Sequence, residues 1–520
     1  MQGTSMFSRR QILAGAGVGL VAAPAILRAQ QLLTAFPFRL GIASGDPSHD
    51  GFVIWTRLCP DPVDEHGGMP MGPVDVDWFV YEDVGMKRVA QKGSATAWPE
   101  LGHSIHVELA GLQPDRPYWY RFVLGRDKTQ LGRTRTLPAP GAAFDRLRFA
   151  AAGCQHYEDG LFTAYAHLAR EDVAFIWHYG DYIYEDRARQ VNYERDGRAR
   201  VHVRDHVGTE CYTIGDYRRR YAQYKMDPDL QAAHRVAPWF TTFDDHEVVD
   251  NWTSTVSPYQ PDPALFAIRR AAAMQAYYEH MPLRRASMPS NGAMQLYRRS
   301  RIGDLLTTHF LDTRQYRSPL PCKGGFEPTC PAVADPKQTV LGGAQQQWLE
   351  RGLSDGGSRW NLVAQQVMMM PLDRQSEPGG GEIRNLDSWA GYDAARERMA
   401  ARFAGRGDVI VMTGDEHQNF AGELRRQGGK GEVAAPEFVV TSISSGGDGW
   451  VRPEVQAQLR AHNPALQYVS DQRGYAVCEV TRDLWQTRFR GVDQVTTPGG
   501  AIATLATASV ERGKPAINLS

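Results

Sequence analysis

The chain has no excess of charge of one sign and no long hydrophobic run beyond its amino-terminal segment. Its 58 Lys and Arg residues nearly balance its 59 Asp and Glu residues, which leaves a net charge of −1. A whole-molecule basic field, of the kind that holds nucleic acid or an anionic membrane, is therefore excluded. A membrane-spanning helix needs about 20 apolar residues in a row. Because no later run approaches that length, the mature chain is predicted to have no transmembrane segment.

Cysteine is also scarce. The 520 residues include 6 Cys and no Cys-x-x-Cys unit, so a structural zinc knuckle is not expected. Cys322 and Cys330 flank a loop that contains Gly and Pro, and an exported protein can bridge such a pair. The sequence leaves both states open, the disulfide and the two free thiols. Disorder is not expected, because 12 Trp and 21 Tyr provide ample surface for burial.

The first 30 residues are typical of a targeting segment. Arg9 and Arg10 precede a weakly hydrophobic, Gly-rich stretch at residues 14–23, and Leu27-Arg28-Ala29 resembles a cleavage site. Paired arginines in this position predict a twin-arginine signal peptide over residues 1–30, with the twin-arginine translocase as a partner during export. The alternative is an ordinary secretory signal or a short anchor in which the Arg pair arises by chance. The prediction places the mature protein in the periplasm or outside the cell.

Residues 36–138 show short strand patterns separated by turn residues. Strands are predicted over 38–43, 51–56, 74–81, 104–109 and 118–123. Tyr118 stands near the start of a strand, after the loop that ends at Pro114, as in the tyrosine corner of fibronectin or immunoglobulin sandwiches. We therefore predict a small amino-terminal β-sandwich domain. Residues 136–143, rich in Pro and small residues, are predicted to form a linker.

From residue 146 to about residue 505, strand patterns alternate with helical ones. Helices are predicted over 263–281 and 345–353, and further strands over 360–367 and 438–442. This alternation is typical of a layered α/β domain. In such a domain, ligands bind beyond the carboxyl ends of the strands.

Four apolar runs end in residues that can bind metal. The runs at 147–153, 173–179, 238–243 and 408–413 lead into Cys154, Asp181, Asp244 and Asp415, respectively. Taken alone, a Cys or Tyr after a strand is usually a packing residue. The repetition at four strand ends instead predicts a metal site.

The residue types at these ends favour particular ions. Asp181 and Tyr184 stand three apart, so the carboxylate is placed to bridge two metals and the phenolate to bind one of high charge. Tyrosinate and cysteinate together suit ferric iron better than zinc or magnesium. Asp244, Asp245, His246 and Glu247 follow a strand expected to be buried. Burying adjacent carboxylates is costly without a cation, so a metal or an Arg partner is expected there.

The ordered motifs resemble those of PhoD-type alkaline phosphatases, within the calcineurin-like metallophosphoesterases. The motifs are Cys154, Gly-Asp-x-x-Tyr-Glu at 180–185, Asp-Asp-His-Glu at 244–247 and Gly-Asp-x-His at 414–417. The resemblance implies an α/β/β/α catalytic domain over 146–505 and a secreted phosphatase that hydrolyses phosphate monoesters or diesters by attack of a metal-bound hydroxide. The substrates implied are phosphate-ester small molecules, or diesters of phospholipid or teichoic type.

The resemblance also implies a set of site residues. A ferric ion with calcium would be held by Cys154, Asp181, Tyr184, Asp415 and His417. Asp245 would take the place of the second-metal ligand, with Asn251 or Asp250 as a further one. His246 is the candidate for binding the phosphate or for protonating the leaving oxygen. Arg269 or Arg270 is the candidate for a bidentate phosphate contact, or else both arginines only solvate a helix face.

Three other functions are alternatives to this one. A phospholipase D-like phosphodiesterase would use the same metal site, since the metal chemistry does not fix the number of ester arms. A calcium-dependent binding protein is the non-enzyme alternative, although it has no need of Cys154 and Tyr184 at strand ends. A serine hydrolase is disfavoured, because the Gly-x-Ser-x-Gly at 352–356 follows a helix and precedes a strand, the reverse of a nucleophile elbow.

Overall fold

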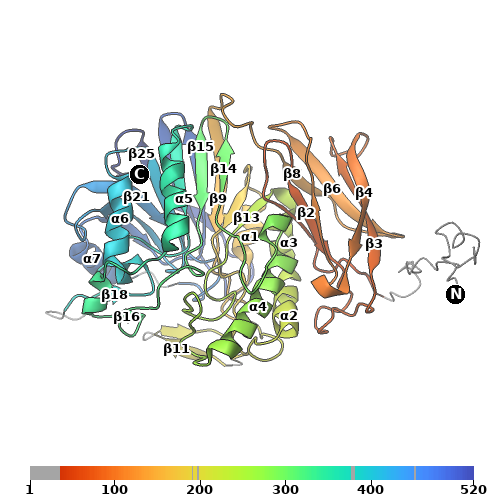
Figure 1. Cartoon of the computed structure of the whole chain (residues 1–520), viewed down its shortest axis with the longest axis horizontal. Coiled ribbons are helices and arrows are strands. Elements are labelled where there is room, and N and C mark those ends of the chain that lie inside the picture. The colour runs from red at the N-terminus through yellow and green to blue at the C-terminus, as the bar shows by residue number, and fades with distance from the viewer. Residues whose placement is uncertain (1–34, 190, 196–197, 376–380, 450–451) are drawn as a thin grey trace, which may run out of the picture.

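The computed structural model describes residues 35–189, 191–195, 198–375, 381–449 and 452–520. The predicted signal peptide at residues 1–30 lies outside them. Within the described residues, no helix is both long enough and apolar enough to cross a membrane. Figure 1 shows the amino-terminal strands, in orange, at one end of the molecule, and the remaining sheets and helices filling the rest.

A large sheet runs through the molecule. At its centre, β9 (Arg146–Ala152), β10 (Ile176–His178) and β13 (Trp239–Thr241) are neighbours and run parallel. Beside β9 it continues antiparallel through β23 (Gly474–Thr481), β24 (Leu484–Val492), β25 (Ile502–Glu511) and β26 (Asn518–Leu519). The three central strands are the predicted runs at 147–153, 173–179 and 238–243.

A second sheet faces the first. Its strand order is β14 (Arg298–Ile302), β15 (Leu306–Phe310), β17 (Trp360–Ala364), β19 (Val409–Thr413), β21 (Val433–Val439), β20 (Asn419–Arg425) and β22 (Leu466–Ser470). Strands β15, β17, β19 and β21 run parallel. One apolar core joins the two sheets, including Phe149 and Trp177 of the first and Trp360 and Ile410 of the second. The two sheets therefore pack face to face.

Helices cover the outer face of each sheet. One core packs the first sheet against α1 (Thr163–Leu168), α2 (Ile214–Lys225), α3 (Pro228–Val236) and α4 (Pro263–His280). Another packs the second sheet against α5 (Gly342–Ser354) and α6 (Asp393–Phe403), and α7 (Pro453–His462) contacts β22. The order helix, sheet, sheet, helix is the predicted α/β/β/α layering. The predicted helix at 263–281 matches α4, where Asp262 caps the amino terminus and Pro263 occupies the first turn.

The amino-terminal strands divide between two sheets. Strands β3 (Val74–Tyr81), β4 (Val89–Ala97), β6 (Pro117–Leu124), β7 (Asp127–Lys128) and β8 (Gly132–Arg135) form a sheet of their own. In contrast, β1 (Ile42–Gly45), β2 (Val53–Arg57) and β5 (Ser104–Glu108) extend the large sheet, because β1 pairs parallel with β13. A shared core packs the two groups together. The large sheet therefore runs across the predicted domain boundary, a topology that a free-standing sandwich does not have.

Two local predictions in this region can be compared with the structure. The Tyr118 hydroxyl lies 2.9 Å from the backbone nitrogen of Gln113, whose N–H it accepts, so the predicted tie to the preceding loop is confirmed. The first strand begins later than predicted, at Ile42 instead of Phe38. A turn closed by the Gly41 N–H on the Phe38 carbonyl, with Gly41 at φ +72°, occupies the start of the predicted range.

A disulfide joins Cys322 and Cys330, which resolves the alternative that the sequence left open. The loop that it closes contains β16 (Phe326–Glu327), which pairs antiparallel with β18 (Arg384–Asn385). Another short hairpin consists of β11 (Tyr193–Arg195) and β12 (Arg198–Arg200).

Glu437, fully buried on β21, predicts a pH-dependent stability. Burial raises the pKa of its carboxyl from 4.5 to about 7, although the backbone N–H groups of Met369 and Met370 donate to it. An acid whose pKa is raised by folding stabilises the fold below its unfolded pKa and loses that contribution as the pH rises through the folded value. We expect Glu437 to lower the free energy of unfolding by about 3 kcal/mol between pH 4.5 and pH 7.

Urea unfolding of the wild type and of Glu437→Gln in chelator, at a series of pH values, measures this contribution. The variant should lose the part of the pH slope that the carboxyl supplies. Glu350→Gln, a change of the same type on partly exposed α5, should keep the wild-type slope. Equal slopes for Glu437→Gln and the wild type would show that folding does not shift the pKa of this carboxyl.

Candidate metal centre

The fold brings the predicted ligand residues together at strand ends. Cys154, Asp181 and Asp245 follow β9, β10 and β13, three adjacent parallel strands whose carboxyl ends share one edge of the large sheet. Asp415 and His417 follow β19 of the facing sheet. The backbone N–H of Ile443, in the loop after β21, donates to the Gly153 carbonyl and so links the two edges. The site therefore lies where the edges of the two sheets meet.

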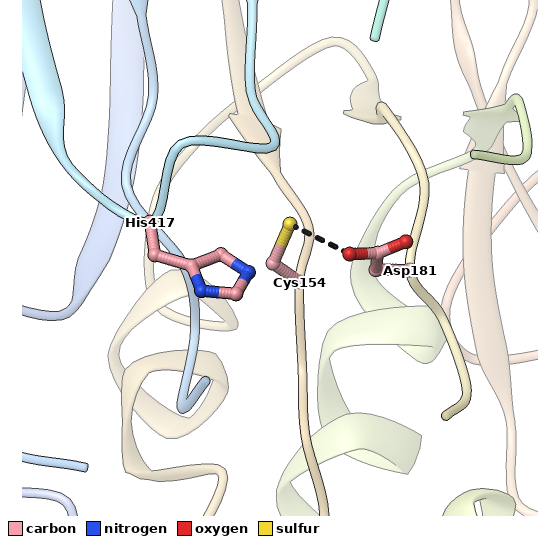
Figure 2. A group of neighbouring side chains, drawn as sticks. All are labelled: Cys154, Asp181 and His417. Carbon is pink, nitrogen blue, oxygen red and sulfur yellow. Dashed lines mark hydrogen bonds between the residues drawn. The ribbon is translucent and has the colours of Figure 1, made fainter. Parts of the chain in front are cut away.

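Cys154, Asp181 and His417 form one group of side chains, and their ligand atoms lie within 4.8 Å of one another. Figure 2 shows them converging from three separate segments, with the Cys154 Sγ 3.3 Å from Asp181 Oδ2. The Tyr184 hydroxyl joins this group, 3.0 Å from Asp181 Oδ2 and 3.2 Å from His417 Nε2. Four of the residues predicted to bind iron are thus in contact.

A second group shares Asp181 with the first. Its ligand atoms come from Asp181, Asp244, Asp245 and Asp415, again within 4.8 Å of one another, and a related group joins Asp181, Asp245 and His246. The Asn251 backbone N–H donates to Asp245 Oδ2 at 2.7 Å, which places this residue beside the same carboxylates. Asp181 therefore lies between the two groups, where the sequence predicts a carboxylate that bridges two metals.

Five of the predicted ligands have a left-handed backbone. Cys154, Asp181, Asn251, Asp415 and His417 have φ between +50° and +66°. Residues other than Gly seldom adopt this region, because it costs about 1 kcal/mol or more. Such strain persists only where the surrounding structure imposes it, and it clusters at functional sites. The strained backbone at these five residues therefore supports their assignment to a functional site.

Two glycines allow the site to close around Tyr179. Gly153 precedes Cys154, and Gly414 precedes Asp415. A Cβ at either glycine would lie 2.3 or 2.2 Å from the Tyr179 ring, which real side chains do not tolerate. The Tyr179 hydroxyl donates to the Thr441 carbonyl at 2.7 Å. The ring therefore sits against both ligand-bearing turns, and only glycine permits this approach.

The charges of the group call for a cation. Burial raises the pKa of the Cys154 thiol, the Tyr184 phenol and the Asp181 and Asp415 carboxyls well above their usual ranges, with neighbouring carboxylates adding to the effect. Asp181 Oδ1 is buried and has no hydrogen-bond partner. Buried oxygen and sulfur donors with an orphaned carboxylate oxygen fit a metal with hard and thiolate ligands. The residues present therefore fit a metal centre.

His246 forms its hydrogen bond with Glu185 and is not part of the group that contains Cys154. Its Nδ1 lies 2.8 Å from Glu185 Oε2, and its Nε2 lies 3.7 Å from Asp250 Oδ1. Burial alone would lower the pKa of His246, but the charges of Glu185, Asp245 and Asp181 raise it well above the usual value. The ring is thus oriented by Glu185, and Nε2 lies beyond hydrogen-bond length of Asp250.

Arg314 is a site residue that the sequence analysis missed. It is fully buried, with Nε 2.5 Å from Asp244 Oδ1 and Nη2 3.5 Å from Asp245 Oδ2. Burial would raise the pKa of Asp245, but Arg314 and then His246 hold it below its usual range. The sequence did predict a metal or Arg partner for these carboxylates. The available signal is Asp312-Thr-Arg314, which follows β15 after Leu311; this strand was not predicted from the sequence.

The two arginines proposed from the sequence make their contacts elsewhere. Arg269 pairs with Glu210 at 3.0 Å and donates to the Tyr217 hydroxyl at 3.1 Å. Arg270 donates to the Ser254 carbonyl and lies over the Trp252 ring. Both stand on α4, and their contact with a bound phosphate stays a prediction.

Two models of known protein families match the chain. The PhoD-like phosphatase model matches residues 149–489, and the model of the PhoD-like phosphatase amino-terminal domain matches residues 23–138. The alkaline phosphatase D of Bacillus subtilis (strain 168) is 41% identical over 514 residues, covering 96% of this chain and 87% of its own length. These matches span both the amino-terminal strands and the candidate metal centre.

Two solved structures of phosphatases superpose on this chain. A structure of PhoD superposes with a TM-score of 0.89 at 40% identity, covering 94% of this chain and 92% of its own. The purple acid phosphatase PPD1 from yellow lupin (Lupinus luteus) superposes with a TM-score of 0.53 at 13% identity, covering 91% of this chain and 74% of its own. The second likeness concerns the fold alone.

Proposed function

The chain belongs to the PhoD-like phosphatase family and is a phosphatase, and we propose that it hydrolyses phosphate esters at the metal centre built around Asp181. Family membership makes it an enzyme, in place of the binding protein that the sequence left as an alternative. The observation that carries the proposal is the orphaned, buried Asp181 Oδ1 between two groups of ligand atoms.

We assign ferric iron to the first group and calcium to the second. Cys154, Tyr184 and His417 supply the thiolate, phenolate and imidazole that suit a ferric ion, with Asp181 shared. Asp245 and Asp415 would supply oxygen ligands of the kind that calcium prefers, and Asn251, whose backbone N–H donates to Asp245, would be a further one. When bound, the ions supply positive charge for the phosphate oxygens and lower the pKa of a bound water.

The chain's own residues prepare the reaction in two ways. Glu185 fixes the His246 ring through Nδ1, so Nε2 is the nitrogen available to a phosphate or to the leaving oxygen. Arg314 positions Asp244 and Asp245 through its ion pairs with both carboxylates. Arg269 and Arg270 are kept as candidates for a phosphate contact, although their present partners are Glu210, Tyr217 and Ser254. The substrates proposed are monoesters and diesters, including phospholipid or teichoic-type diesters, met by an enzyme exported through the twin-arginine route.

The metal assignment predicts a colour. Protein purified without chelator should contain iron and show a visible charge-transfer band, because phenolate and thiolate ligands donate strongly to ferric iron. Tyr184→Phe and Cys154→Ser should each remove or shift the band. Cys478→Ser, a buried thiol whose Sγ lies 3.6 Å from the Thr487 hydroxyl, should leave it unchanged. A band indifferent to both ligand changes would remove Tyr184 and Cys154 from the centre.

Substrate preference is measured in the same preparation. Rates on a phosphate monoester and on a diester with the same leaving group separate the phosphatase from the phospholipase D-like alternative. A kcat/KM for the diester that greatly exceeds that for the monoester would favour the alternative. Comparable values would support one site that accepts both.

A further inference from the structure

Residues 384–387 reach both halves of the candidate metal centre. The first half is the turn after β19 that carries Asp415 and His417, and the second half is the pair of carboxylates after β13, Asp244 and Asp245. We call residues 384–387 the clasp. We propose that the clasp positions both halves of the centre, and that the Cys322–Cys330 disulfide holds the clasp in place. The inference rests on the proposed function, because it requires that the centre hold metal.

The first half is reached through Asn385. Its Nδ2 donates to Glu416 Oε1 at 3.1 Å, and Glu416 stands between the candidate ligands Asp415 and His417. The Glu416 side chain is 2% exposed and also pairs with Arg374. Glu416 is therefore an anchor, and its two partners fix the turn that carries both ligands.

The second half is reached through Asp387, which is 4% exposed. Its Oδ2 lies 2.9 Å from Arg314 Nη2. Arg314 in turn contacts Asp244 at 2.5 Å and Asp245 at 3.5 Å. Asp387 therefore sets where the guanidinium lies against the carboxylates of the second group.

The two halves are joined inside the clasp itself. The Asn385 Oδ1 accepts the Asp387 backbone N–H at 3.1 Å, while Nδ2 of the same amide donates to Glu416. Both ends of the Asn385 amide are thus engaged, which fixes its orientation. A shift of the clasp would move the contacts to Glu416 and to Arg314 together.

The loop closed by the disulfide pairs with the clasp through backbone hydrogen bonds. In that loop, Phe326 and Glu327 pair with Asn385 and Arg384, and the Leu386 N–H donates to the Gly325 carbonyl at 2.8 Å. Figure 1 shows β16 and β18 next to each other below α6. An isolated pair of two-residue strands has little stability of its own. The disulfide closes this loop over a separation of 8 residues and so limits the conformations in which the pairing is lost.

The test follows metal release from the holoenzyme into excess EDTA, by elemental analysis at timed intervals well below the unfolding temperature. The paired change Cys322→Ser with Cys330→Ser should accelerate release by about 10-fold, the lower end for the loss of an outer contact to metal ligands. Asn385→Ala should have a similar effect. Lys323→Ala, an exposed side chain in the same loop, should release metal at the wild-type rate.

Combining the changes tests the route. If the disulfide acts through Asn385, the triple variant should release metal no faster than the more affected of its two parents, because the effects share one path. Effects that multiply to about 100-fold would overturn that route. A wild-type release rate in both the paired Ser variant and Asn385→Ala would overturn the clasp while leaving the proposed function intact. A wild type that holds no metal would overturn both.

Discussion

Asp181→Asn should abolish most of the activity while leaving the metal-free fold as stable as before or more so. Asp181 belongs to three of the four groups of potential metal ligands in the described part of the chain. An amide is a weaker ligand and cannot carry the negative charge that a bridge between two cations needs. We expect kcat/KM to fall by about 10³-fold, or about 4 kcal/mol of transition-state stabilisation.

The stability of the same variant moves in the other direction for an electrostatic reason. Burial raises the pKa of Asp181 well above its usual value, with Asp245 and Asp244 adding to the effect, although His246 opposes it. A neutral amide removes that repulsion, while its oxygen can still accept from Cys154 and Tyr184. In EDTA, the midpoint of thermal unfolding of Asp181→Asn should therefore equal or exceed that of the wild type.

The measurements are kcat/KM on a monoester and thermal unfolding with metal and with EDTA. Asp262→Asn is the matched control, because it makes the same change at the cap of α4, where Asn serves about as well as Asp. It should alter neither quantity. An Asp181→Asn enzyme with near wild-type kcat/KM would mean that Asp181 does not bridge the two groups.

Arg314→Met should cost about 3–5 kcal/mol of stability, the usual result of leaving a buried charge without its partner. Arg314 is fully buried against Asp244, Asp245 and Asp387. Arg314→Lys is the more informative change, because it keeps the charge but cannot span three carboxylates as the planar guanidinium does. We expect this variant to fold and to lose about 10²-fold in kcat/KM through displacement of Asp245.

Arg317→Lys provides the comparison. Arg317 is also buried and donates to the Asp387 carboxylate at 3.1 Å, but it forms no ion pair with Asp244 or Asp245. Its replacement should lower stability by a similar amount and kcat/KM by a smaller factor. Urea unfolding and steady-state kinetics measure the two effects. Equal kinetic losses in both Lys variants would place the role of Arg314 at Asp387 and not at the carboxylates of the second group.

The sequence by itself determined which side chains follow the central strands. Apolar runs that end in Gly and then in Cys154, Asp181 or Asp415 predicted both the strands and the candidate ligands, because a buried strand and the turn after it are local features of the chain. The carboxyl ends of parallel strands meet at one sheet edge, so convergence could also be expected. The helix at 263–281 could be predicted for the same reason, since it depends on near neighbours in sequence. The disulfide between Cys322 and Cys330 could not, because the sequence left the bridged pair and the two free thiols equally open.

Only the tertiary structure decided which distant residues complete the site. Arg314 follows β15 of the facing sheet, and no local pattern shows that its guanidinium reaches Asp244, 70 residues away. Asn385 ends the two-residue strand β18 and Asp387 lies just beyond it, and no local pattern shows that their partners are Glu416 and Arg314. The large sheet likewise crosses the predicted domain boundary, because β1 pairs with β13. Long-range pairing depends on the packing of whole layers, and neither periodicity nor spacing along one strand encodes it.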